Sequence, residues 1–239
     1  SLEKLAAVIN DTKKRGGNVI IPSFAINRTQ EVLYYLDQLS DANKIPELLT
    51  FVDSPMAVDV TEVYNMYPED FDEEAKEILE KENSLFHFPL LKMAKSANES
   101  KAINHIKGSA IIIAGSGMCT GGRIKHHLVS NLSRPESTIL FVGYQADGTL
   151  GRIILEKPKD VRLFGQNRSV CARIEKINGF SAHADKNELL KWVSGFKNPP
   201  EKIFIVHSEK NVAKEFSKTL KDQTKSDVII PKYLDEYQV

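Results

Sequence analysis

The sequence predicts an α/β fold in which helices flank a parallel sheet. Two observations support this prediction: short apolar runs typical of buried strands recur along the chain, and helical patterns separate them. The predicted strands cover residues 18–22, 48–52, 110–114 and 137–143. Strands that alternate with helices are typical of βαβ units, so we expect these four to run parallel, with helices on both faces.

Start and stop signals place the first helices between these strands. A helix is predicted from Leu2 to Arg15, because two glycines follow it. Asn27–Gln30 resembles a capping box that opens a helix through Leu39. Ser54-Pro55 is typical of an N-cap followed by proline at the first helical position.

Two later segments carry weaker signals. Residues 68–84 are acidic with a helical pattern, which predicts a solvated helix face. Residues 92–100 show no clear period, so we expect a mobile loop with little chemistry.

The apolar runs become shorter beyond Gly143. Shorter apolar runs follow at 161–164 and 170–174, and a final strand is predicted at 228–230. We therefore expect two domains, residues 1–145 and residues 146–239.

The composition of the chain bears on whether it binds a polyanion, and on the cellular compartment in which it works. The 32 basic and 32 acidic residues cancel, so a polyanion would need a local positive patch. Cys119 and Cys171 form no CxxC pair, which is typical of a reducing compartment. All apolar runs are too short to cross a bilayer, so we expect no membrane partner and a cytoplasmic location.

A glycine-rich loop, Gly115–Arg123, follows the strand at 110–114 and leads into a helix predicted to begin near Gly121. Backbone N–H groups and the positive end of a helix dipole would favour an anion there. The loop lacks the Gly-Lys-Ser/Thr of a P-loop, and its spacing differs from a dinucleotide-binding fingerprint. Phosphate binding, a dinucleotide site and a tight turn without a ligand remain open.

Two histidines lie at the ends of predicted elements. His207 ends the apolar run 201–207, and His183 precedes a helix predicted around residues 189–193. Open α/β sheets place their chemistry at the carboxyl ends of strands, so this pair suggests an active site. The adjacent His126 and His127 point in different directions and are interpreted as surface or partly packed residues.

Two acidic residues have structural as well as functional interpretations. Asp185 and Glu188 have the spacing of a capping box, which would fix a helix start. Glu31 lies in the first turn of its predicted helix, where a carboxylate complements the helix dipole without any further function.

Five segments together resemble the β-CASP branch of the metallo-β-lactamase superfamily, in the family's order. They are Ile20–Glu31, Asp53–Met56, Gly115–Met118 with Gly121–Arg123, Phe180–Asp185, and Val206-His207. This family includes RNA-processing nucleases, and the chain is most similar to the prokaryotic members. The resemblance implies a β-CASP domain in residues 1–145, followed by the C-terminal portion of a metallo-β-lactamase αββα fold.

The resemblance also implies roles for named residues. Glu31, His183 and His207 match the first, second and third β-CASP motifs, the third histidine being a zinc ligand. His183, with Glu31 and Asp185 in support, would protonate the leaving oxygen of a cut phosphodiester, and two zinc ions would activate water. The implied phosphate or RNA contacts are Ser116, Gly117, Arg123 and Ser181.

Two departures from the family pattern bear on activity. No His-x-His-x-Asp-His segment occurs, although that segment supplies most zinc ligands in the family, and Ser208 stands where glycine usually follows the motif histidine. We therefore expect the chain to be part of a longer zinc-dependent ribonuclease and to lack the N-terminal lactamase half. By itself, the chain is expected to be inactive and free of metal.

The expected partner is RNA, with single-stranded DNA as the alternative. A homodimer through an exposed sheet edge is a further hypothesis. The alternative function is a non-catalytic, nucleic-acid-binding scaffold subunit of an RNA-processing complex.

Overall fold

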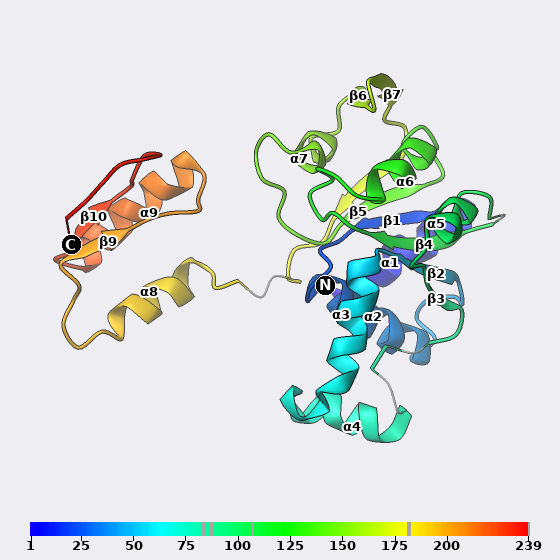
Figure 1. Ribbon diagram of the computed structural model, residues 1–239, viewed down its shortest axis with the longest axis horizontal. Coiled ribbons are helices and arrows are strands. Elements are labelled where there is room, and N and C mark those ends of the chain that lie inside the picture. Colours follow the sequence, from blue (N-terminus) through cyan, green and yellow to red (C-terminus); the bar gives the residue numbers. More distant parts are fainter. Residues whose placement is uncertain (83–84, 87, 107, 181–182, 239) are drawn as a thin grey trace. The chain divides into compact units, whose positions relative to one another are not determined.

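Six parallel strands form the central sheet of the first compact unit, in the order β3-β2-β4-β1-β5-β8 (Figure 1). The computed structural model describes residues 1–82, 85–86, 88–106, 108–180 and 183–238. The strands are β1 (Val19–Pro22), β2 (Leu49–Asp53), β3 (Leu91–Met93), β4 (Ala110–Ala114), β5 (Thr138–Phe141) and β8 (Arg173–Lys176). The predicted parallel sheet is confirmed.

Side chains that alternate along the strands divide the core between the two faces of this sheet. In β4, Ile111 and Ile113 face one cluster, whereas Ile112 and Ala114 face the other. The first face is covered by α1 (Leu2–Lys14), α2 (Arg28–Asp41), α3 (Pro55–Met66) and α4 (Glu73–Glu82), with the 3₁₀ helix η1 (Pro68–Asp70) between the last two. The second face is covered by α5 (Ala97–Ile103), α6 (Ile124–Asn131) and α7 (Leu150–Leu155).

Strand β1 lies between β4 and β5, and its register with both is regular. Val19 pairs with Ile111 on one side and with Thr138 on the other. All six strands therefore end at the same edge of the sheet, and the loops after β1, β2, β4 and β5 gather there.

An antiparallel hairpin, β6 (Asp160–Leu163) and β7 (Gln166–Ser169), joins the second face of the sheet. Val161 and Leu163 are buried in the same cluster as the α6 side chains. The two-residue turn at the tip consists of Phe164 and Gly165.

A second compact unit covers residues 182–239. It contains α8 (Lys186–Ser194), β9 (Lys202–Phe204), α9 (Lys210–Gln223) and β10 (Asp227–Ile229), with β9 and β10 paired in parallel. Strand β9 is shorter than the predicted run 201–207 and is only partly buried. The small core of this unit contains Ile205, Ala213, Leu220 and Val228.

The two compact units divide after residue 181, because the β6–β7 hairpin and β8 pack with the first sheet. This division describes packing alone, and the predicted boundary between family domains at 145 and 146 stays a prediction. Among the described residues, every helix is too short or too polar to cross a membrane.

The prediction of a mobile loop at residues 92–100 is wrong. This segment contains the end of β3 and the start of α5. Ser96 caps α5 by accepting a hydrogen bond from the Glu99 amide at 3.2 Å, and the Glu99 carboxylate accepts one from the Ser96 amide at 2.7 Å. The helix is only seven residues long, so it shows no clear period in the sequence. The capping box was the one sequence feature that indicated it.

The predicted capping box at Asn27–Gln30 is also wrong, although the helix itself is confirmed. Asn27 has φ 63° and its side chain caps nothing. Gln30 is buried and donates to the Thr61 hydroxyl at 2.9 Å instead. The cap at Ser54 is confirmed, since its hydroxyl accepts from the Ala57 amide at 3.4 Å.

Candidate functional site

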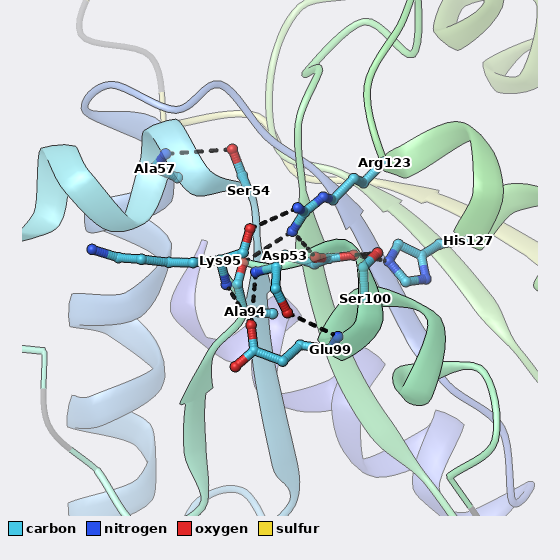
Figure 2. A network of polar contacts seen from close by, with 10 residues as sticks. Asp53, Ser54, Ala57, Ala94, Lys95, Glu99, Ser100, Arg123 and His127 are labelled. Carbon is cyan, nitrogen blue, oxygen red and sulfur yellow. Dashed lines mark hydrogen bonds and ion pairs between the residues drawn. The ribbon is translucent and has the colours of Figure 1, made fainter.

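Asp53 lies at the carboxyl end of β2, and its side chain is completely buried. Its carboxylate accepts hydrogen bonds from Arg123 Nη1 at 2.8 Å and from His127 Nε2 at 2.6 Å (Figure 2). Ser100 Oγ donates to the same carboxylate at 2.5 Å. Residues from α5, the glycine-rich loop and α6 thus meet at one buried charge.

The contacts fix the protonation of this network. Burial by itself would raise the pKa of Asp53, but the hydrogen bonds from His127, Ser100 and Arg123 outweigh burial and lower its pKa below the usual value. Asp53 is therefore a carboxylate, which can only accept. His127 Nε2 is therefore the donor in its contact with Asp53, while Nδ1 has no hydrogen-bond partner in the described part of the chain.

Arg123 connects the carboxylate to the neighbouring backbone. Its guanidinium also donates to the carbonyl of Ala94 at 3.1 Å and to that of Lys95 at 2.7 Å (Figure 2). The end of β2, the segment after β3 and the start of α6 are therefore held in one arrangement. The visible role of Arg123 is to hold this edge of the sheet, and its predicted contact with phosphate stays a prediction.

The glycine-rich loop closes on itself between β4 and α6. The Ile124 amide donates to the Gly115 carbonyl at 3.0 Å, and the Gly121 amide donates to Ser116 Oγ at 3.3 Å. Gly122 has φ 73°, and a Cβ there would lie 2.3 Å from the Gly115 oxygen, so the loop requires glycine. The helix begins at Ile124 and not near Gly121, because the glycines form this turn.

This closure changes which groups the loop can offer to an anion. Its amides at Ser116, Cys119, Gly121 and Ile124 are bonded within the loop. The hydroxyls of half-buried Ser116 and exposed Thr120, 3.2 Å apart, are two side-chain donors of the loop at the surface. Gly117 is buried, and a Cβ there would lie 2.6 Å from the ring of Phe24, so its visible role is close packing.

Glu31 lies in the first turn of α2, after the carboxyl end of β1. It forms an ion pair with Arg28 at 2.7 Å, and its side chain is 24% exposed. Burial raises the pKa of the Glu31 carboxyl, although the Arg28 guanidinium acts in the opposite direction. Glu31 lines a depression of about 490 Å³ together with Tyr34 and Tyr35.

Asp185 starts α8 in the second unit. Its Oδ1 accepts from the amides of Asn187 at 2.7 Å and Glu188 at 2.9 Å, and the Glu188 carboxylate accepts from the Asp185 amide at 2.8 Å. The predicted capping box is confirmed. The exposed His183 lies two residues before this cap.

His207 lies beyond the carboxyl end of β9 and is exposed. Its φ of 56° lies in the left-handed region, which histidine adopts more often than most other side chains do. Ser208, the position where the sequence departs from the family's glycine, does not take a positive φ.

The predicted site residues fall in two groups. Glu31, Ser116, Gly117 and Arg123 belong to loops or helix starts at one edge of the six-stranded sheet. His183, Asp185 and His207 belong to the second unit, and Ser181 lies outside the described residues. Among the described residues, no three His, Cys, Asp or Glu side chains form a group that could hold a metal.

The sequence analysis missed the buried network around Asp53. The interpretation of His127 as a surface or partly packed residue is wrong, because its side chain is 0% exposed. Two signals could have found it: Asp53 ends an apolar strand run, and His127 lies four residues after Arg123, which places both on one face of the helix. His126 is exposed, as expected of its neighbour.

Family models match most of the chain. The Beta-Casp domain matches residues 29–154, and the Zn-dependent metallo-hydrolase RNA specificity domain matches residues 168–231. Glu31 and the glycine-rich loop lie in the first span, whereas His183, Asp185 and His207 lie in the second. The chain belongs to the β-CASP family of the metallo-β-lactamase superfamily, a family of RNA-processing nucleases.

Curated relatives carry names from RNA metabolism. Ribonuclease TTHA0252 of Thermus thermophilus is 35% identical over 87% of this chain and 47% of its own length. Transcription termination factor FttA of Methanocaldococcus jannaschii is 31% identical over 99% of this chain and 38% of its own length. An RNase J-like protein of the same archaeon is 32% identical over 95% of this chain and 52% of its own length. The chain thus spans about half the length of these relatives, or less.

Proposed function

We propose that this chain is part of a zinc-dependent ribonuclease that hydrolyses phosphodiester bonds in RNA. The observation that supports the proposal best is the position of His207. Its exposed imidazole lies just beyond the carboxyl end of the parallel strand β9, within the segment that matches the Zn-dependent metallo-hydrolase RNA specificity domain. Open α/β sheets bind their ligands beyond the carboxyl ends of their strands.

His207 fits a zinc ligand by its chemistry, because a neutral, accessible imidazole is a common ligand of this metal. Zinc, when bound, would lower the pKa of a bound water and supply a nucleophile at neutral pH. One imidazole does not hold zinc, and the described residues offer no group of three ligands. The remaining ligands would therefore come from residues outside those described here.

Three further residues would act on the substrate. His183 would donate a proton to the leaving oxygen of the cut phosphodiester. Asp185 fixes the start of α8, and this cap would position the segment that carries His183. Glu31 would contribute the carboxylate of the first family motif, and its place in a half-buried ion pair restricts its rotamers.

The glycine-rich loop would contact the phosphates of the RNA. The Ser116 hydroxyl is a surface donor of the loop. Arg123 would reach a phosphate through the 21% of its side chain that stays exposed beside its ion pair with Asp53. Gly117 would act by allowing the close approach of Phe24. Ser181, outside the described residues, completes the set that the family resemblance implies.

A second candidate is a non-catalytic, nucleic-acid-binding subunit of an RNA-processing complex. The names of several relatives favour it, since these proteins are called transcription termination factors and not nucleases. Cleavage by the purified protein distinguishes the two candidates.

The test compares RNA cleavage by the full-length gene product with cleavage by Glu31→Gln and His183→Ala variants. Loss of a general acid or its supporting carboxylate should lower the rate about 100-fold or more. RNA binding should stay within about twofold, because neither change alters the fold. An exposed histidine outside the proposed site provides the control, and His105→Ala should cleave at the original rate. Full activity of both site variants would contradict the assignment.

A further inference from the structure

Phe164 occupies the tip of the β6–β7 hairpin in a conformation that does not suit it. Phe164 and Gly165 have φ of 47° and 78°, as in the tight turns that favour Asn-Gly. A phenylalanine at the first of these positions is strained, and its side chain is 55% exposed. Neither turn formation nor core packing accounts for this residue.

The exposed ring is held by two side chains of α6. It stacks on His126, with ring centroids 4.8 Å apart and an interplanar angle of 29°. Lys125 Nζ lies 4.9 Å from the centroid of the same ring. We call Phe164, His126 and Lys125 the Phe164 platform.

The platform belongs to a basic region of a chain that is neutral overall. Residues 150–176 contain seven basic and three acidic residues, a net charge of +4, whereas residues 53–80 contain one basic and ten acidic residues, a net charge of −9. Arg162 lies on the exposed face of β6, two residues before Phe164. Among the described residues, no carboxylate forms an ion pair with Lys125, Lys157, Lys159 or Arg162.

We propose that the Phe164 platform is a binding site for single-stranded RNA. A base stacks on the exposed part of the Phe164 ring, and the adjacent cations bind its phosphates. Aromatic rings beside positive charge are the means by which proteins hold unpaired strands. The inference rests on the proposed function for the identity of the polymer, but the platform lies on the hairpin and α6, which carry none of the residues assigned to cleavage.

Fluorescence anisotropy with this chain and a short labelled oligoadenylate tests the site. Phe164→Asn replaces the ring by a residue that suits the turn, so the thermal midpoint should not fall. Loss of one stacked base should weaken binding about tenfold. Lys125→Gln should reduce the steepness of the plot of log affinity against log salt concentration by about 1, the contribution of one phosphate contact.

Two controls isolate stacking from charge. Tyr67 is 51% exposed in the acidic region, so Tyr67→Asn should leave affinity unchanged. An abasic strand of the same length should bind the original chain and Phe164→Asn equally, because it has no base to stack.

The proposal is overturned if the original chain binds no RNA, if it binds only the matching DNA, or if the Phe164→Asn variant binds oligoadenylate as tightly as the original chain does. Failure of the platform is distinguishable from failure of the proposed function. A full-length protein that cleaves RNA while Phe164→Asn binds normally refutes the platform alone. Phe164-dependent binding by a full-length protein that never cleaves refutes the nuclease alone.

Discussion

At the scale of single residues, the buried Asp53 carboxylate links several elements of the first unit. Burying an ionised carboxylate is costly unless other groups compensate for the lost water. Arg123 and His127, at the start of and within α6, and Ser100, on α5, provide that compensation. The network therefore holds together the elements at the edge of the sheet where Glu31 and the glycine-rich loop lie.

Replacing Asp53 by asparagine should destabilise the first unit by about 3 kcal/mol at neutral pH, because Arg123 and His127 lose their charged partner. Chemical denaturation measures this difference. The exposed pair Asp59 and Lys95 provides the control, and Asp59→Asn should cost less than about 0.5 kcal/mol.

The difference in stability between the original chain and Asp53→Asn should depend on pH. The pKa of Asp53 is lowered in the folded state, so its contribution to stability is complete above the unfolded pKa of about 4 and is lost as pH falls through the folded value. The stability difference between the original chain and Asp53→Asn should therefore shrink below about pH 4. A difference that stays constant down to about pH 2 would contradict the assignment of charge.

At the scale of elements, the sequence predicted the regular parts well. The apolar runs that form β1, β2, β4 and β5 are flanked by glycine, proline or capping residues. The apolar pattern and the flanking residues therefore indicate the same element boundaries. The errors lie where elements are short or where side chains act across the fold. Helix α5 has seven residues, too few to show a period, and Gln30 bonds to Thr61 from another helix.

The candidate site was predictable to a smaller extent. Family motifs pointed to Glu31, the glycine-rich loop, His183 and His207. The partnership of Asp53 with His127 joins residues 74 positions apart, and only the sheet order brings them together. The position of Asp53 at a strand end and the four-residue spacing of Arg123 and His127 are local signals, but neither identifies the other as its partner.

The glycine-rich loop makes a prediction at this scale. Gly122→Ala should destabilise the first unit by at least about 1 kcal/mol, because alanine is strained at this φ and its Cβ would clash with the Gly115 carbonyl. Thermal or chemical unfolding measures the loss. Gly121→Ala is the matched control, since a Cβ there meets no atom within 4 Å. Equal effects of both substitutions would argue against the closed loop.

At the scale of the whole molecule, charge is balanced but unevenly distributed. The net charge of zero results from acidic residues concentrated around α3 and α4 and basic residues concentrated beyond residue 150. Composition alone therefore could not reveal a surface for a polyanion, and the prediction that such a surface would be local stays a prediction. Dimerisation through the edge of a sheet stays a prediction, which the solution mass at high concentration would test.

The isolated 239-residue chain should not cleave RNA, even with added zinc, because His207 alone cannot hold a metal that needs about four ligands. A gel assay with labelled RNA, with and without EDTA, measures this. Robust cleavage that EDTA abolishes would show that the chain assembles a metal site by itself.

The most direct test of the account is the zinc content and RNA-cleavage rate of the full-length gene product beside its His207→Ala variant, with His105→Ala as the control for removing an exposed histidine. The original and control proteins should bind about two zinc ions and cleave RNA, whereas His207→Ala should bind less zinc and react at least about 100-fold more slowly. A full-length protein that binds no zinc and cleaves no RNA would contradict it, and would make the chain part of a nucleic-acid-binding scaffold.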